Sequence, residues 1–170
     1  SVADFGDVHL RIINADGSGD VRLTNRAAFQ PAWSPDGARI AFVTLGDKDI
    51  FLINPDGTGE VNLTQGFSED DGPTWSPDGS RIAFTTSPLG PSSEIEVAVM
   101  NRDGSNRMIL TDGPGFDFEP VWSPDGTKIV FTRFENSDTE IYVMNADGGN
   151  QTNVSNRPDT QETTPDWNGQ

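Results

Sequence analysis

The chain has 170 residues, and its 27 acidic against 11 basic side chains give a net charge of −16, so we expect neither a nucleic-acid nor an anionic-membrane partner. The absence of cysteine excludes disulfides, thiolate nucleophiles and cysteine-bound metals. The length suits one domain, no apolar run reaches the length of a membrane span, and Ser1 in place of methionine predicts a processed chain.

A β-hairpin is the first element that the sequence predicts. Val8, Leu10 and Ile12 alternate with other residues, which is typical of a strand with one buried face. The stretch 14–17 predicts a tight reverse turn, because its Asn, Asp and Gly tolerate positive φ, and Val21 to Thr24 should return as the partner strand. The same hairpin pattern, each time with an Asp-Gly turn, recurs over residues 49–64, 94–111 and 140–155.

A five-residue tryptophan motif precedes each of the three later hairpins. Trp-Ser-Pro-Asp-Gly stands at 33–37, 75–79 and 122–126, and a degraded copy stands at 165–167. Proline in the second place and glycine in the fourth place of Ser-Pro-Asp-Gly predict a turn between two strands. The tryptophans stand 42, 47 and 45 residues apart, and repeats of about 40–45 residues are typical of four-stranded propeller blades.

Each repeat therefore predicts four strands, and no segment has helical periodicity. The predicted fold class is all-β, a four-bladed β-propeller of four-stranded antiparallel blades. We expect a single domain with blades at 31–72, 73–119 and 120–162, and a last blade that joins 163–170 to 1–30. The second strand of that last blade is its weak point, because either Val2 to Phe5 form it as a short strand or it is missing.

The segments Pro73 to Phe84 and Pro120 to Phe131 share the pattern PxWSPDGxxIxF, followed by an acidic residue, an apolar strand and an Asp-Gly turn. This pattern resembles the TolB-type, WD-like β-propeller repeat, and the resemblance covers nearly the whole chain. It implies a propeller and leaves the ligand open. TolB-like relatives usually have more blades, so two architectures stay open: a monomeric four-bladed ring, or termini that pair with a second copy in a dimeric ring or a polymer.

Acidic residues before the tryptophans are the candidate metal ligands, because turn chemistry does not require them. Asp70, Asp117 and Glu162 stand five places before their tryptophans, and Asp71 and Glu119 add further carboxylates. These segments lead into the innermost strands, so their side chains should converge near the propeller axis, where calcium would suit a set of oxygen ligands. Hydration with backbone hydrogen bonds is the alternative. A second acidic series, expected at the start of the third strands, comprises Asp7, Asp49, Glu94 and Glu140.

The sequence contains no catalytic motif. His9 is the sole histidine and no Gly-x-Ser-x-Gly stretch accompanies it, so we expect no Ser-His-Asp site and no enzyme activity. The four tryptophans and the aspartates of the turns are expected to be structural. Apolar residues in and beside the longer loops are the candidate interface: Leu89, Phe116, Phe118 and Phe134.

The function that these observations predict is a non-catalytic scaffold for protein–protein interaction, secreted, periplasmic or on the cell surface. Its most concrete form is self-assembly into a homo-oligomer or polymer through edge strands or blade faces. Two alternatives stay open, a calcium- or ligand-binding module and an accessory propeller fragment of a larger TolB-like protein or hydrolase.

Overall fold

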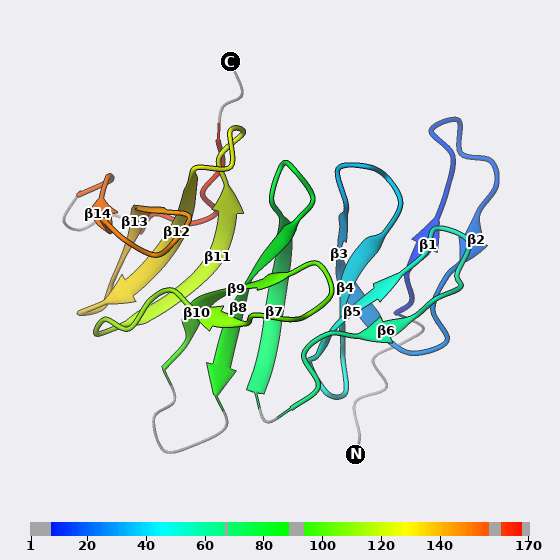
Figure 1. Cartoon of the computed structure of the whole chain (residues 1–170), viewed down its shortest axis with the longest axis horizontal. Helices are drawn as coiled ribbons and strands as arrows, with labels where there is room; N and C mark the ends of the chain where they lie inside the picture. The colour runs from blue at the N-terminus through cyan, green and yellow to red at the C-terminus, as the bar shows by residue number, and fades with distance from the viewer. Residues whose placement is uncertain (1–7, 67, 89–93, 157–160, 168–170) are drawn as a thin grey trace.

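The computed structural model describes residues 8–66, 68–88, 94–156 and 161–167, and within these ranges the regular structure consists of strands alone. Three four-stranded antiparallel sheets and one two-stranded sheet stand side by side in a fan (Figure 1). This arrangement confirms the prediction of an all-β propeller built from repeated antiparallel blades. The described part of the chain contains no helix that is long and apolar enough to cross a membrane.

The three complete blades follow one another along the chain, and each pairs its strands in chain order. The first blade comprises β3 (Ala28–Trp33), β4 (Ile40–Thr44), β5 (Ile50–Ile53) and β6 (Val61–Asn62). The second blade comprises β7 (Ser68–Trp75), β8 (Arg81–Pro88), β9 (Glu96–Asn101) and β10 (Met108–Ile109). The third blade comprises β11 (Phe116–Trp122), β12 (Lys128–Glu135), β13 (Asp138–Asn145) and β14 (Thr152–Asn153). The two-stranded sheet is the hairpin of β1 (Arg11–Ile12) and β2 (Val21–Arg22).

The fourth repeat is present as two separate pieces. The β1–β2 hairpin packs on the first blade, where Leu10 and Leu23 share a buried cluster with Phe42. The segment 161–167 lies beside β11, so the two pieces stand at opposite ends of the fan (Figure 1). Within one chain they do not meet, and sharing of this blade between two chains stays a prediction. The predicted short strand, Val2 to Phe5, lies outside the described residues.

The hydrophobic core lies between neighbouring blades. Trp75, at the end of β7, packs on Ala41 and Val43 of the first blade, and Trp122 makes the equivalent contact between the second and third blades. The second strands share one fully buried aromatic position, occupied by Phe42, Phe84 and Phe131. Because each core is shared, a blade buries its apolar face only when its neighbour is in place.

The Ser-Pro-Asp-Gly turns are held by their own side chains. Ser76 Oγ donates to Asp78 Oδ1 over 2.6 Å and accepts the backbone N–H of Arg81 over 2.9 Å. Hydrogen bonds from the Ser76 hydroxyl and from the N–H and hydroxyl of Ser80 lower the pKa of Asp78 to about 2. Gly79 has φ +67°, which an L side chain rarely adopts. The same serine–aspartate bond recurs at 34–36 and 123–125, so the repeated letters are explained by the turn.

We expect Ser76→Ala to lower the free energy of unfolding by about 1–2 kcal/mol, because the N–H of Arg81 loses its acceptor. Ser105→Ala is the matched control, since Ser105 donates a 2.6 Å bond to Asp103 in an exposed turn, and it should cost about 0.5 kcal/mol or less. Urea unfolding followed by tryptophan fluorescence measures both losses. Equal losses in the two variants would contradict the expectation.

Each first strand contains a β-bulge three residues before its tryptophan. The pairing register with the second strand shifts there in all three blades. The residues with positive φ at this place are Gln30 (+48°), Gly72 (+58°) and Glu119 (+56°). The bulge lets each strand extend further back, so the first strands begin at 28, 68 and 116, ahead of the expected blade starts at 31, 73 and 120.

Candidate functional site

Asp70, one of the predicted metal ligands, forms an ion pair. Its carboxylate is fully buried and accepts hydrogen bonds of 3.1 and 2.8 Å from the guanidinium of Arg107. The hydroxyl of Ser68 donates a further bond of 3.2 Å. The guanidinium lies 5.1 Å from the ring centre of Phe84, so it is held by an aromatic face as well as by the carboxylate. The charge of Asp70 is therefore balanced within its own blade.

Asp117 occupies the same place in the third blade and is paired more tightly. Arg133 Nε and Nη2 each donate to one carboxylate oxygen over 2.6 Å, and both side chains are buried. The hydrogen bond from Arg133 to Asp117 raises the pKa of the guanidinium above its usual value. Gln151 accepts a further bond of 3.0 Å, and the ring of Tyr142 lies 4.6 Å from the guanidinium. This is a bidentate, desolvated ion pair.

The two arginines reach the same position from different strands. Arg107 stands just before β10, whereas Arg133 lies within β12. In the second blade the β12-like position is Thr86, whose hydroxyl accepts from Arg107. In the third blade the Arg107-like position is Gln151, which accepts from Arg133. Sequence reasoning missed both arginines, although aligning the repeats would have shown that these two positions exchange a basic residue for a polar one.

The remaining candidate ligands do not gather around Asp70 and Asp117. Asp71 Oδ1 accepts the N–H of Gly72 over 2.9 Å, and Glu119 Oε2 accepts the N–H of Thr164 over 3.3 Å. Glu162 donates its own backbone N–H to Thr139 over 2.9 Å. Among the described residues, no group of three or more acidic or histidine side chains is arranged to hold a metal ion. The calcium site stays a prediction.

We expect a calcium chelator to leave the midpoint of thermal unfolding within about 1 °C of its value in added calcium, because arginines already balance the buried carboxylates. Differential scanning calorimetry at matched ionic strength measures this. Matching matters because a net charge of −16 makes any added salt stabilising through screening. A midpoint that rises specifically with calcium, and not with an equal ionic strength of sodium chloride, would contradict this expectation and support the calcium site.

The second acidic series differs from the prediction in two places, the second blade and the N-terminal hairpin. In each complete blade, the N–H of one third-strand residue bonds to a hydroxyl at the end of the outer hairpin. The residue directly before it is acidic in all three blades: Asp49, Glu96 and Glu140. Glu94 stands two residues earlier and is exposed, because the loop before β9 is longer than its counterparts. Asp7 lies outside the described residues, and the equivalent place in the hairpin is His9. The fourth-strand hydroxyls are those of Thr64, Thr111 and Ser155.

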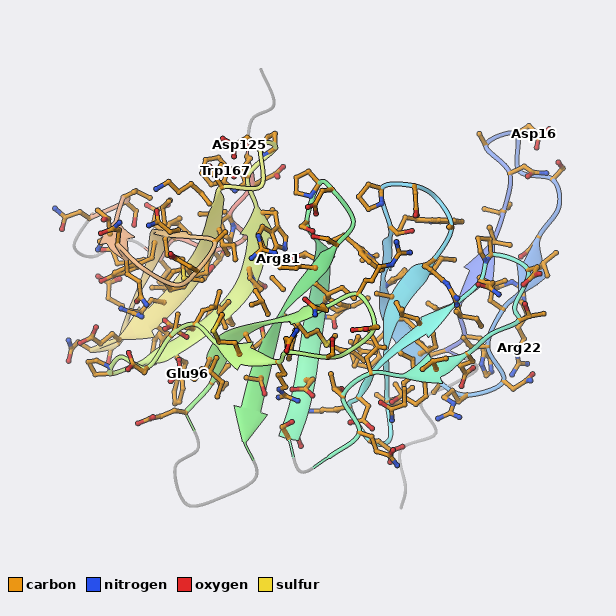
Figure 2. The ribbon with its side chains drawn as sticks, in the orientation of Figure 1. Asp16, Arg22, Arg81, Glu96, Asp125 and Trp167 are labelled. Carbon is orange, nitrogen blue, oxygen red and sulfur yellow. The ribbon has the colours of Figure 1, made fainter. Side chains whose placement is uncertain are left out.

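Two carboxyls of this series are buried, those of Asp49 and Glu96, and Figure 2 labels Glu96. The hydroxyl of Thr111 donates to it and accepts the N–H of Val97 in turn. Burial raises the pKa of Glu96 to about 7, and the neighbouring charges of Asp117 and Glu94 act in the same direction. The site therefore changes its charge near neutral pH beside the Asp117 ion pair.

The candidate aromatic interface lies at one end of the third blade. Phe116 and Phe134 stand opposite each other in the β11–β12 pairing, and their rings stack with centroids 6.3 Å apart. Phe116 is exposed and Phe118 is partly buried, whereas Leu89 lies outside the described residues. A polar pocket of about 200 Å³ on the same blade is lined by Arg133, Glu135, Asn136, Asp138, Glu140 and Tyr142. The use of these aromatic residues as an interface stays a prediction.

Trp33 departs from the rest of the tryptophan series. It is 49% exposed, whereas Trp75 and Trp122 are 8% and 5% exposed. It faces a groove of about 230 Å³ between the β1–β2 hairpin and the first blade. The apolar lining of this groove consists of Leu10, Ile12, Ile13, Leu23, Pro31 and Ile40 together with Trp33. Trp33 therefore does not share the interblade burial of Trp75 and Trp122.

No protein-family model matches the sequence, and no curated protein matches it. Among solved structures, the chain is similar to a putative TolB from Agrobacterium tumefaciens, with a TM-score of 0.78 and 29% identity over 89% of this chain and 57% of that chain. It is also similar to TolB from Acinetobacter baumannii, with a TM-score of 0.71 and 25% identity over 85% of this chain and 37% of that chain.

An enzyme has the same fold. The chain matches an oligogalacturonate lyase in complex with manganese with a TM-score of 0.73 and 22% identity, over 92% of this chain and 44% of that chain. At this identity the likeness shows the fold alone, so it carries no conclusion on catalysis or metal binding. The chain spans about half the length of these solved proteins or less.

Proposed function

Because the chain has the fold of TolB-type β-propellers, we propose that it is a non-catalytic scaffold for protein–protein interaction that assembles with further copies of itself. An exported location, whether secreted, periplasmic or on the cell surface, belongs to the same proposal and is supported by the likeness to TolB. The observation that carries the proposal is the pair of incomplete blade halves at opposite ends of the fan (Figure 1).

The state of the buried charged groups supports a binding role over a catalytic one. Asp70 and Asp117 are held by arginines, which suits structural ions and does not suit a general acid or base. His9 lies on the outer hairpin, where its Nδ1 is 3.0 Å from the carbonyl of Arg26 and 3.1 Å from Arg22 Nη2. These contacts support a structural role for all three residues.

Sedimentation velocity over a wide concentration range tests the self-assembly. The expected result is a mass above the 18.4 kDa of one chain that increases with concentration. The assembly should strengthen with moderate salt, because two chains that each carry a charge of −16 repel one another at low ionic strength.

A second candidate function is an accessory propeller part of a larger TolB-like protein. The lengths favour it, since the chain spans 57% and 37% of the two TolB proteins that it resembles. A mass of 18.4 kDa at every concentration would support this candidate and would remove self-assembly.

A further inference from the structure

At the junctions between the three complete blades, the tryptophan of the later blade is buried against the preceding blade, in a site that we call the tryptophan seat. Trp33 is exposed, so its own seat is incomplete. Trp75 packs on Ala41 and Val43 of the preceding second strand, and its Nε1 donates over 3.1 Å to the carbonyl of Ala32, the residue before the preceding tryptophan. The contact of Trp75 thus has two parts, an apolar surface and a carbonyl acceptor one residue before a tryptophan; Trp122 shares the apolar part, whereas its Nε1 has no hydrogen-bond partner among the described residues. The same rule applied to Trp33 requires a tryptophan strand on the open side of the first blade.

Part of this seat is already built by the hairpin. Leu10 and Ile12 are the counterparts of Ile50 and Leu52, which share a buried cluster with Trp75. The hydrogen bonds show the equivalence, because the N–H of Leu10 bonds to the hydroxyl of Thr24 as that of Ile50 bonds to the hydroxyl of Thr64. Leu10 and Ile12 line the groove beside Trp33. The described residues supply there neither a second strand, the counterpart of β4, nor the tryptophan segment with its carbonyl.

The segment 161–167 has the properties of the missing strand. Trp167 Nε1 donates over 3.2 Å to the carbonyl of Val121, the residue before Trp122, which repeats the contact of Trp75. The N–H of Glu162 bonds to Thr139 over 2.9 Å, as that of Asp70 bonds to Lys48 over 2.7 Å. The segment therefore occupies the place of a first strand of a further blade, although it is not itself part of a sheet, and its Asp166 is exposed. Figure 2 shows Trp167 far from the hairpin that carries Asp16 and Arg22.

We propose that Trp33 of one chain is covered by the 161–167 segment of a second copy, with Trp33 Nε1 donating to the carbonyl of Asp166 of that copy. This inference rests on the proposed self-assembly and names the surfaces that carry it. The two surfaces differ, so the contact is head-to-tail and heterologous, and it closes into a ring or grows as a filament according to the rotation per chain. Apolar burial around one central tryptophan is the usual form of an interface hot spot.

Sedimentation velocity of four chains tests the contact: wild type, Trp33→Ser, Trp167→Ser and the control Ile109→Ser. Each tryptophan variant should weaken the association by about 30-fold or more. Trp33 is half exposed, so its replacement leaves the interblade cores intact. Ile109 is 51% exposed on the outer strand β10, and its replacement should leave the association unchanged.

Sedimentation velocity of an equimolar mixture of Trp33→Ser and Trp167→Ser is the decisive measurement, because it tests whether the contact is head-to-tail. A head-to-tail contact retains one intact junction in the mixture, so a two-chain particle should return when the variants are combined. Masses that stay high in Trp33→Ser would overturn this contact and leave self-assembly to another surface. A mixture that fails to recover would point to a symmetric contact and overturn the head-to-tail arrangement. A wild type that stays monomeric would overturn the inference together with the self-assembly beneath it.

Discussion

Replacing Arg133 with methionine is expected to lower the free energy of unfolding by about 3–5 kcal/mol. This is the largest effect that we expect from replacing one buried charged side chain. The physical reason is that Asp117 is 1% exposed and takes two 2.6 Å bonds from this guanidinium. Without Arg133 the carboxylate would stay buried without a counter-charge, or would have to take up a proton. Urea unfolding at pH 7 measures the loss.

The double variant Asp117→Leu with Arg133→Met separates the pair from its environment. Because the desolvation cost of both ions disappears together, the double variant should lie within about 2 kcal/mol of the wild type. Arg107→Met is the matched control in the second blade. The Arg107 side chain is 32% exposed, so water can reach Asp70 after the change, and the loss should be about 1–2 kcal/mol. A double variant as unstable as Arg133→Met would contradict this account.

The propeller fold could be predicted because its determinants are local and repeated. In residues 75–79 the serine, the aspartate and the glycine each serve a turn whose bonds span five residues or fewer. Alternation in the hairpins and the spacing of the tryptophans then place each turn in a four-stranded unit. These signals recur with the same geometry in all three complete blades.

The partners of the acidic residues could not be predicted, because they are set by pairing across strands. Arg107 lies 37 residues from Asp70, and the equivalent arginine of the third blade comes from a different strand. The bulge at Gly72 and its counterparts also shifts the register of the first strands, and a shift of this kind is not visible in the alternation of residues. Glu94 stands two residues before the buried position, which Glu96 occupies instead.

The repeated motif predicts which packing contact each tryptophan would make, and it does not say whether the neighbouring blade is complete enough to make that contact. Trp33 has the same motif as Trp75, yet it is exposed because the preceding blade is divided between the two ends of the fan. The exposure of one member of an otherwise buried series is therefore more informative than the series itself. It separates the tryptophans that close the internal cores, Trp75 and Trp122, from the one that is exposed.

Glu96→Gln is expected to raise the free energy of unfolding by about 2 kcal/mol at pH 8 and to leave it nearly unchanged at pH 4. Burial raises the pKa of Glu96 from 4.5 in the unfolded chain to about 7 in the folded chain. Between these pH values the folded state binds more protons than the unfolded state, so the contribution of Glu96 to the free energy of unfolding falls as pH rises from 4.5 to about 7. Glutamine retains an acceptor for the Thr111 hydroxyl and carries no charge at any pH.

The difference in free energy of unfolding between variant and wild type, measured from pH 4 to pH 8, isolates Glu96 from the other carboxylates. Glu140→Gln is the control, because Glu140 holds the same place in the third blade, accepts from the Ser155 hydroxyl and is only partly buried. Desolvation is the leading cause of the raised pKa of Glu96. The gain in the free energy of unfolding should therefore be specific to Glu96, which is buried more deeply than Glu140. Parallel curves for the two variants would show that the loss of a carboxylate, and not its burial between the second and third blades, governs the response.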